Sequence, residues 1–289
     1  MAFRRAPAHR RLGRPPAFDR LTDYDKVLLM VTPIIPADDP IKPVVAAYAA
    51  TFEKLAAATG HARRGPNGAV LAVSGAPIAT LNAVISPDVE PIPDEIAALA
   101  AFEGRWEVPW SIHVRGEAGP LVTKVAAEHG LTQFTRQPLM IRRPERGLPA
   151  EPAVDSLRIR AVPADELDLY AETVADGFEA PREMFTVMAD RSLANVDGLT
   201  FYLAELRGIP VGTGMTAVSG GLTGIFNITT LPGHRRRGYG RAVTMAMVRA
   251  GYAAGATTAY LYASTMAESV YESAGFRTEE HLTVITAPA

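Results

Sequence analysis

Two stretches of the chain repeat the same order of landmarks, and this internal repeat limits the possible folds more than any other feature. The apolar run 69–73 leads into Gly75-Ala76-Pro77-Ile78, and the run 200–206 leads into Gly208-Ile209-Pro210-Val211. Each pattern predicts a strand, a tight turn containing glycine, and a second strand. We therefore expect two copies of one α/β unit.

A second pair of landmarks follows in each copy. Gly130-Leu131 and Gly275-Phe276 each follow a helical pattern and lead into an apolar run, which is typical of a helix that ends at glycine before a strand. Gly130 lies 55 residues after Gly75, whereas Gly275 lies 67 residues after Gly208, so the first copy is 12 residues shorter between these landmarks.

The segment between the copies predicts a domain boundary. Residues 144–152 contain three prolines and several charges, which neither a helix nor a central strand tolerates. A chain of 289 residues is long enough for two cores. We expect a flexible basic tail at 1–24, a first domain at 25–143, a linker at 144–155 and a second domain at 156–289.

The second copy predicts a mixed α/β sandwich. Its expected strands are 157–162, 200–206, 211–218, 223–230 and 258–263, with a closing strand pair within 276–286; its expected helices are 164–175, 182–194, a long one from Gly238, and 266–274. In the long helix an apolar stripe is expected to pack on the sheet, which makes its methionines core residues: Val243, Ala246, Met247, Ala250 and Ala254.

The first copy predicts a similar but abbreviated order. A helix carries Val44, Tyr48, Thr51 and Leu55 on one side. A hairpin, a helix near 94–102, a strand near Trp110, and a terminal helix and strand follow.

The segment from Thr229 to Arg241 carries the chemistry. A strand ends, Pro232 breaks it, and a basic, glycine-rich turn opens the long helix. Helix N-termini present unpaired backbone N–H groups and a partial positive charge, which suits an anion such as a diphosphate. Glycines at 238 and 240 let a ligand approach the backbone closely. The turn is neither a Walker loop nor a Rossmann fingerprint, because no G-K-S/T follows and the first glycine of G-x-G-x-x-G is absent.

This turn resembles that of the GNAT acyltransferases, whose shared motif Q/R-x-x-G-x-G/A is matched by Arg235-Arg236-Arg237-Gly238-Tyr239-Gly240. The tyrosine and Gly-Phe further along in that family are matched by Tyr271 and Gly275-Phe276. The resemblance covers about 157–286, and reaches the first copy only through the repeat. It implies two GNAT-like domains in tandem, with acetyl-CoA as the donor and no metal.

The resemblance also implies site residues. The backbone of Ile228 and Thr230 would face the pantetheine arm, and the diphosphate would be held by the turn, which comprises Arg235, Arg236, Arg237, Gly238, Tyr239, Gly240 and Arg241. Ser264 stands where the family often has an asparagine that touches the cofactor, so the contact there is in question.

Tyr271 is the candidate catalytic acid. When an amine attacks a thioester, the leaving sulfur becomes negative, and a phenol can donate a hydrogen bond or a proton to it. The alternative is an aromatic that only packs under the C-terminal strands. Glu183 and Glu205 are candidate bases, although each is also typical of a solvated position.

The first copy lacks these features. At the position of the anion-binding turn it has Asp88, Glu90, Asp94 and Glu95, which would repel a diphosphate, and Ala126 replaces the tyrosine. We therefore expect a degenerate GNAT-like domain that shapes the substrate cleft of the second.

Composition excludes several function classes. The net charge is −2, so we expect no nucleic-acid or membrane partner. There are no cysteines, and the six histidines show no zinc-binding spacing. The arginine-rich N-terminus lacks a signal-peptide core and no apolar run spans a membrane, so a cytoplasmic protein is expected.

Together these features predict an N-acetyltransferase that moves an acetyl group from acetyl-CoA to a primary amine of a small molecule or peptide, with a homodimer left open. The alternative is a non-catalytic acyl-CoA-binding sensor or scaffold. A third possibility is a nucleic-acid-binding module driven by the arginine tail, whose binding would depend steeply on salt.

Overall fold

The strands of both copies join a single mixed sheet in the computed structural model, which describes residues 39–102, 107–144, 156–264 and 266–288. Residues from Pro40 onward form one compact unit. The expected basic tail at 1–24 and, apart from Pro144, the expected linker at 144–155 lie outside the described residues, so these predictions stay open.

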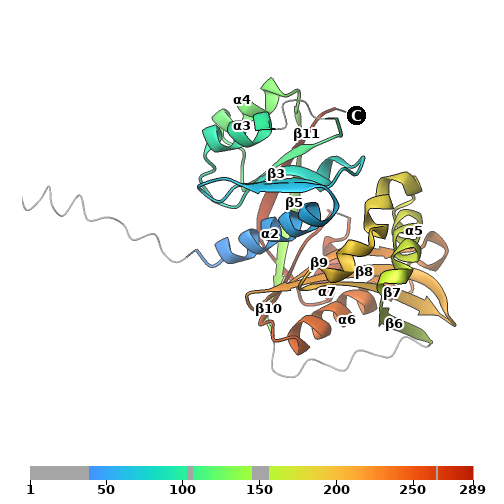
Figure 1. Ribbon diagram of the computed structural model, residues 1–289. Helices are drawn as coiled ribbons and strands as arrows, with labels where there is room; N and C mark the ends of the chain where they lie inside the picture. The colour runs from blue at the N-terminus through green and yellow to red at the C-terminus, as the bar shows by residue number, and fades with distance from the viewer. Residues whose placement is uncertain (1–38, 103–106, 145–155, 265, 289) are drawn as a thin grey trace, which may run out of the picture. The chain divides into compact units, whose positions relative to one another are not determined.

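Two halves follow one another along the chain (Figure 1). The N-terminal half comprises α2 (Lys42–Thr59), β1 (His61–Arg64), β2 (Val70–Val73), η1 (Ala79–Leu81), β3 (Asn82–Ser86), α3 (Pro93–Phe102), β4 (Ser111–Arg115), α4 (Pro120–Glu128) and β5 (Gln133–Arg142). The C-terminal half comprises β6 (Leu157–Ala161), η2 (Ala164–Glu166), α5 (Leu167–Phe178), η3 (Arg182–Ala189), η4 (Arg191–Asn195), β7 (Leu199–Leu206), β8 (Ile209–Ser219), β9 (Leu222–Thr230), η5 (Pro232–His234), α6 (Tyr239–Ala253), β10 (Thr258–Tyr262), α7 (Glu268–Ser273) and β11 (Arg277–Thr286).

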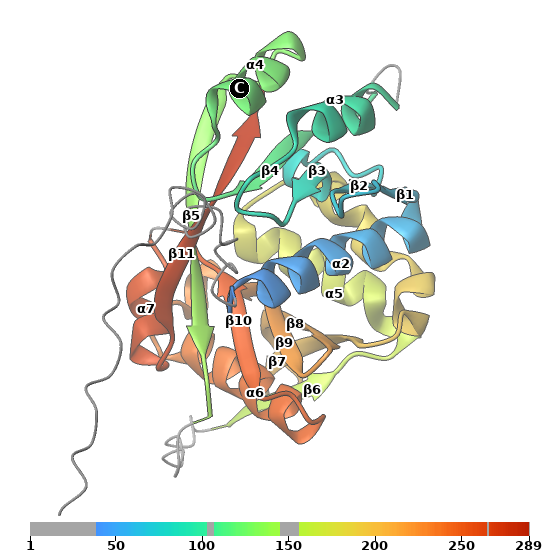
Figure 2. The same ribbon diagram turned by 90° about the vertical axis from the view of Figure 1, so that its left-hand side faces the viewer.

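The halves exchange their last strands. The sheet order is β1-β2-β3-β4-β11-β5-β10-β9-β8-β7-β6. The end of β5, residues 139–142, pairs with β10, while the end of β11, residues 282–286, pairs with β4. β5 and β11 also pair with each other over nearly their whole length. Each half therefore completes its sheet with a strand from the other half, as Figure 2 shows for the long β5 and β11.

Strand alternation divides the helices between the two faces of the sheet. On β7, Phe201 and Leu203 pack with α5, whereas Ala204 packs against Val243 of α6. In the same way, Val70 and Ile85 pack with α2, whereas the neighbouring residues of these strands pack with α3 and α4. α5 and α6 therefore cover opposite faces.

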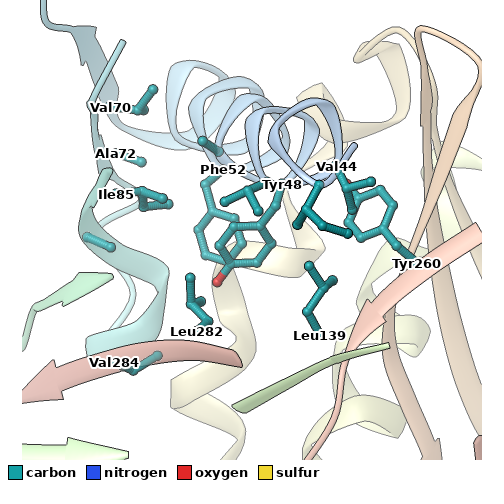
Figure 3. Close-up of a cluster of buried hydrophobic side chains, with 14 of the residues drawn as sticks. Val44, Tyr48, Phe52, Val70, Ala72, Ile85, Leu139, Tyr260, Leu282 and Val284 are labelled. Atoms are coloured by element: carbon teal, nitrogen blue, oxygen red, sulfur yellow. The ribbon is translucent and has the colours of Figure 1, made fainter. Parts of the chain in front are cut away.

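The core beneath α2 joins the two halves. Val44, Tyr48 and Phe52 of α2 and Ile85 of β3 belong to one cluster, in which Val44 lies beside Tyr260 (Figure 3). The same cluster contains residues from three further strands: Leu139, Tyr260, Leu282 and Val284. The predicted apolar side of this helix is confirmed, because all four of its expected residues are buried.

The stripe predicted on the long helix is confirmed in part. Val243 and Met247 are buried, as is Met245, so the methionines are core residues. Ala250 is only half-buried and Ala254 is exposed beyond the end of α6. The buried face is completed instead by Thr244, Val248 and Gly251.

Three predictions about local structure are wrong. The closing strand pair within 276–286 is one strand, β11, whose register shift between Thr278 and Glu280 bends it without a turn. The helix expected at 182–194 is two 3-10 segments, because Asp190 interrupts it and its side chain accepts a hydrogen bond from the Ser192 N–H.

The third error concerns the repeat landmarks. Gly208 lies in the turn between β7 and β8, but Gly75 lies between β2 and β3. Counted back from the exchanged strands, β2 and β3 correspond to β8 and β9, so these two glycines are not equivalent. Gly130 and Gly275, by contrast, occupy matching helix ends, with φ of +76° and +82°.

Candidate functional site

β9 and β10 pair only at their beginnings. Their parallel register joins Leu222–Gly224 to Thr258–Tyr260. β9 also carries a bulge, because Asn227 and Ile228 lie opposite the single residue Gly214 of β8, and Asn227 has a φ of +52°. The strands therefore separate after Gly224, and the later part of β9 is bent beside a space that an extended ligand could enter.

The basic turn lies at the end of this bent strand. Arg236 and Gly238 both have positive φ, 65° and 81°, and α6 begins at Tyr239. The N–H groups of the first turn of α6 have no partner within the helix, as at any helix start. The side chain of Tyr239 is buried in the core, so only its backbone can serve a ligand.

The side chain of Arg235 is exposed, but its guanidinium is bonded to the protein. Its Nε donates to the Thr230 carbonyl oxygen at 3.1 Å and its Nη2 to the Gly177 carbonyl oxygen at 3.0 Å. Its Nη1 also lies 2.6 Å from a carboxylate oxygen of Glu179. These contacts fasten the turn to the ends of β9 and α5.

Two hollows follow one another along β9 and α7. The first, of about 450 Å³, is bordered by the turn and one side of α7: Thr230, Arg235, Arg236, Gly238, Tyr239, Gly240, Arg241, Ser269, Val270 and Ser273. The second, of about 290 Å³, includes Ile228, Ser264 and Tyr271 in its lining. Of the eleven residues predicted from sequence, Arg237 alone lines neither hollow; it is exposed on the turn.

Tyr271 is positioned by α7. It lines the smaller hollow, and its ring lies 6.2 Å from that of Phe276 in an edge-on arrangement. Burial raises the pKa of its hydroxyl to about 12, so the phenol is protonated at neutral pH. A protonated phenol can donate a hydrogen bond or a proton.

The end of α7 is held by the N-terminal half. Arg142 of β5 is buried and its Nη1 donates to the Ala274 carbonyl oxygen at the end of this helix. A Cβ at Gly275 would collide with the same guanidinium, and Gly275 also has a φ of +82°. Glycine is therefore required here on two grounds. The exchanged strand β5 thus fixes the helix that carries Tyr271.

The N-terminal half also forms one wall of the smaller hollow. Its contribution comprises Tyr48, Phe52, Thr80, Leu81, His113 and Gln137. Sequence reasoning did not identify these as site residues, because Tyr48 had the periodicity of a core position and His113 stood alone. Only the contact between the halves brings them to the site.

His113 and Tyr48 form a buried hydrogen-bonded chain. Ser111 Oγ donates to the Ala79 carbonyl oxygen at 3.0 Å and lies 2.8 Å from His113 Nε2. Nε2 is therefore the protonated nitrogen, and Nδ1 accepts from the Tyr48 hydroxyl at 3.1 Å. Burial lowers the pKa of His113 to about 3, so the imidazole is neutral.

Neither glutamate considered as a base lines the smaller hollow. Glu205 is buried and accepts from Arg160 Nε at 2.8 Å, in an ion-pair cluster that includes Glu166. Glu183 is exposed on η3. Glu205 is therefore buried rather than solvated and is poorly placed to act as a base, because Arg160 pairs with its carboxylate away from the smaller hollow.

The acidic loop of the N-terminal half corresponds in place to the basic turn, because it joins β3 to α3 as the turn joins β9 to α6. Asp88 pairs with Lys42 at 2.6 Å. The buried Glu95 accepts from the Asn67 N–H at 2.7 Å, so its carboxylate serves a neighbouring loop.

The sequence of the site region matches a known family. Residues 197–278 match the family profile described as "Acetyltransferase (GNAT) domain". This match assigns residues 197–278, rather than the whole chain, to a GNAT acetyltransferase domain. The matched residues run from just before β7 to the start of β11 and include the basic turn and Tyr271.

Solved structures resemble the whole described unit in fold. A GCN5-related N-acetyltransferase from Kribbella flavida has a TM-score of 0.61 and 23% identity, covering 88% of this chain and 97% of that one. A chain from Novosphingobium aromaticivorans described as a GNAT-family acetyltransferase has a TM-score of 0.53 and 16% identity, covering 86% and 97%. No protein of curated function matches the chain by sequence.

Members of the GNAT family use acyl-CoA, and the residues beside the separated strands suit such a ligand. The divergence of β9 from β10 gives an opening, and the turn gives backbone N–H groups and arginines beside the larger hollow. The described residues contain no group of three side chains that could hold a metal ion, and no described helix is both long and apolar enough to cross a membrane.

Proposed function

We propose that the protein is an N-acetyltransferase that moves an acetyl group from acetyl-CoA to a primary amine of a small molecule or peptide. The observation that carries this proposal is the position of Tyr271, which borders the smaller hollow while the basic turn borders the adjoining one. A single ligand running beside β9 and α7 could then place its diphosphate at the turn and its reactive group beside Tyr271.

The turn would hold the diphosphate through the backbone at the start of α6 and through the cationic side chains around it. Arg235 would act mainly by keeping the turn in shape, because its donors already serve Thr230 and Gly177. Ile228 and Thr230, on the bent part of β9, would face the pantetheine arm, with Ser264 across from them.

Acetyl-CoA supplies an acyl group activated as a thioester. Tyr271, whose phenol is protonated at neutral pH, would donate its proton toward the leaving sulfur as the C–S bond breaks and the C–N bond forms, while the attacking amine releases a proton to solvent. The wall of aromatic rings around the smaller hollow would exclude water from the reacting centre, which limits hydrolysis of the thioester.

We infer that the N-terminal half is a degenerate GNAT-like domain that no longer binds the cofactor. Its acidic loop stands where the C-terminal half has the basic turn, and buried Ala126 stands where the other half has Tyr271. We infer that it completes the sheet through β5 and that α2 closes one side of the smaller hollow.

Release of CoA from acetyl-CoA in the presence of a panel of primary amines tests this function. Because the chain has no cysteine, a thiol reagent reports CoA without background from the protein. We expect amine-dependent release. Acetyl-CoA binding without amine-dependent release would support the alternative, a non-catalytic acyl-CoA sensor.

A further inference from the structure

The smaller hollow is walled by aromatic rings from both halves. The ring of Tyr48 on α2 lies 4.7 Å from Phe52, 4.5 Å from Tyr262 on β10 and 6.4 Å from Phe226 on β9. All four residues line the hollow, which measures about 290 Å³. Aromatic walls favour flat apolar groups and also attract one cation over a ring face.

The lining carries no formal charge. None of the described residues around this hollow is Asp, Glu, Lys or Arg, and His113 is neutral because burial lowers its pKa to about 3. A ligand with several ammonium groups would lose solvent here without gaining a carboxylate partner. The hollow is therefore poorly suited to polyamines and to aminoglycoside-like polycations.

Two tyrosines of the lining, Tyr48 and Tyr262, carry hydroxyl groups that could serve a single amino group. Since Tyr48 donates its proton to His113 Nδ1, the lone pairs of its oxygen are left as acceptors. The Tyr262 hydroxyl is buried and has no hydrogen-bond partner within the described part of the chain. Such a buried, unpartnered polar atom in the lining of a pocket calls for a polar group on the ligand.

We propose that this hollow is an acceptor subsite for a compact primary monoamine with an aromatic body, such as an arylalkylamine. The proposal rests on the proposed function and narrows its acceptor. Tyr48 accepts an N–H of the amine and Tyr262 offers a second hydrogen bond, while the rings of Phe52 and Phe226 pack on the aromatic body.

The first test compares acceptors with the wild-type chain. With acetyl-CoA in excess, CoA release is measured with 2-phenylethylamine, spermidine, kanamycin and a lysine-containing peptide. We expect kcat/KM for 2-phenylethylamine to exceed that for the others by about tenfold or more, the scale on which the fit of an apolar group in a pocket discriminates between substrates. A preference for spermidine, kanamycin or the peptide would overturn the inference.

The second test removes one hydroxyl. Tyr48→Phe should raise KM for 2-phenylethylamine about tenfold. Tyr260→Phe is the matched control, since Tyr260 is buried in the same core cluster but does not line the hollow, and its KM should stay unchanged. Equal effects of the two substitutions would overturn the role of Tyr48.

Calorimetric titration with acetyl-CoA distinguishes failure of the acceptor proposal from failure of the proposed N-acetyltransferase function. If acetyl-CoA binds and another amine is acetylated in preference, the acceptor inference fails but the proposed function stands. If acetyl-CoA does not bind and no amine releases CoA, both fail.

Discussion

Tyr271 holds its proton at neutral pH, as an ordinary phenol does, and burial raises its pKa further, to about 12; a general acid requires this protonated state. In Tyr271→Phe the ring remains and most packing is kept. We expect acetyl-CoA affinity to change little, while the single-turnover rate falls about 10²-fold. Single-turnover and steady-state rates should be measured together, since slow product release would mask part of the effect. An unchanged single-turnover rate in a folded variant would leave Tyr271 a packing residue.

The buried, neutral His113 should make the free energy of unfolding depend on pH. Its pKa is about 3 in the folded chain, against about 6.5 unfolded, so below pH 6.5 the unfolded chain binds the extra proton. Stability should therefore fall as the pH drops from 7 to 5, by about 2 kcal/mol from this residue. Urea unfolding at both pH values measures it. His113→Gln should show a smaller loss between the two pH values, and a loss equal to that of the wild type would mean that His113 does not remain neutral in the fold.

Some features of the basic turn could be predicted from the local sequence, and others could not. The sequence could predict that the turn lies between a strand and a helix, because Pro232 ends the strand. It could also predict that Met247 is buried, because the apolar residues of the helix recur with the helical period. The bond from Arg235 to Gly177 could not be predicted, since it depends on how α5 packs beside the turn.

The exchange of strands β5 and β11 between the two halves could not be predicted from local sequence patterns. The apolar run that forms β5 predicts a strand, but its period is the same whether the partner is β4 or β10. The site residues contributed by the N-terminal half, Tyr48 and His113, follow from that arrangement. A family resemblance confined to the C-terminal half therefore could not find them.

Substitutions in the turn should rank in a definite order. Gly238 has a φ of +81°, lines the larger hollow, and has open space where a Cβ would lie, so Gly238→Val is strained and directs its side chain into the proposed diphosphate site. We expect it to weaken acetyl-CoA binding about 100-fold or more, against about tenfold for Arg235→Ala, which loses one cation and loosens the turn.

Gly233→Val is the matched control for this comparison. Gly233 lies in the same loop with open space around its Cβ position, but it has no positive φ and does not line the hollow. Its affinity should remain near that of the wild type. Equally small effects of the Gly238 and Arg235 substitutions would show that the anion binds elsewhere.

At the scale of the whole molecule, the halves depend on each other. β5 lies between β10 and β11, so residues 156–289 alone would lack a central strand and the Arg142 contact to α7. We expect this fragment to show no cooperative thermal unfolding, whereas the whole chain should show one transition. Circular dichroism on both proteins measures this. A fragment that unfolds cooperatively and binds acetyl-CoA would show that the exchange is dispensable.

Titration of acetyl-CoA into the intact chain shows which half binds the cofactor, because the two halves present opposite charges at corresponding loops. We expect one site per chain, present in the wild type and lost in Gly238→Val. Two sites of similar affinity would mean that the acidic segment from Asp88 to Glu95 admits the cofactor. A single site unaffected by Gly238→Val would mean that the basic turn does not bind it.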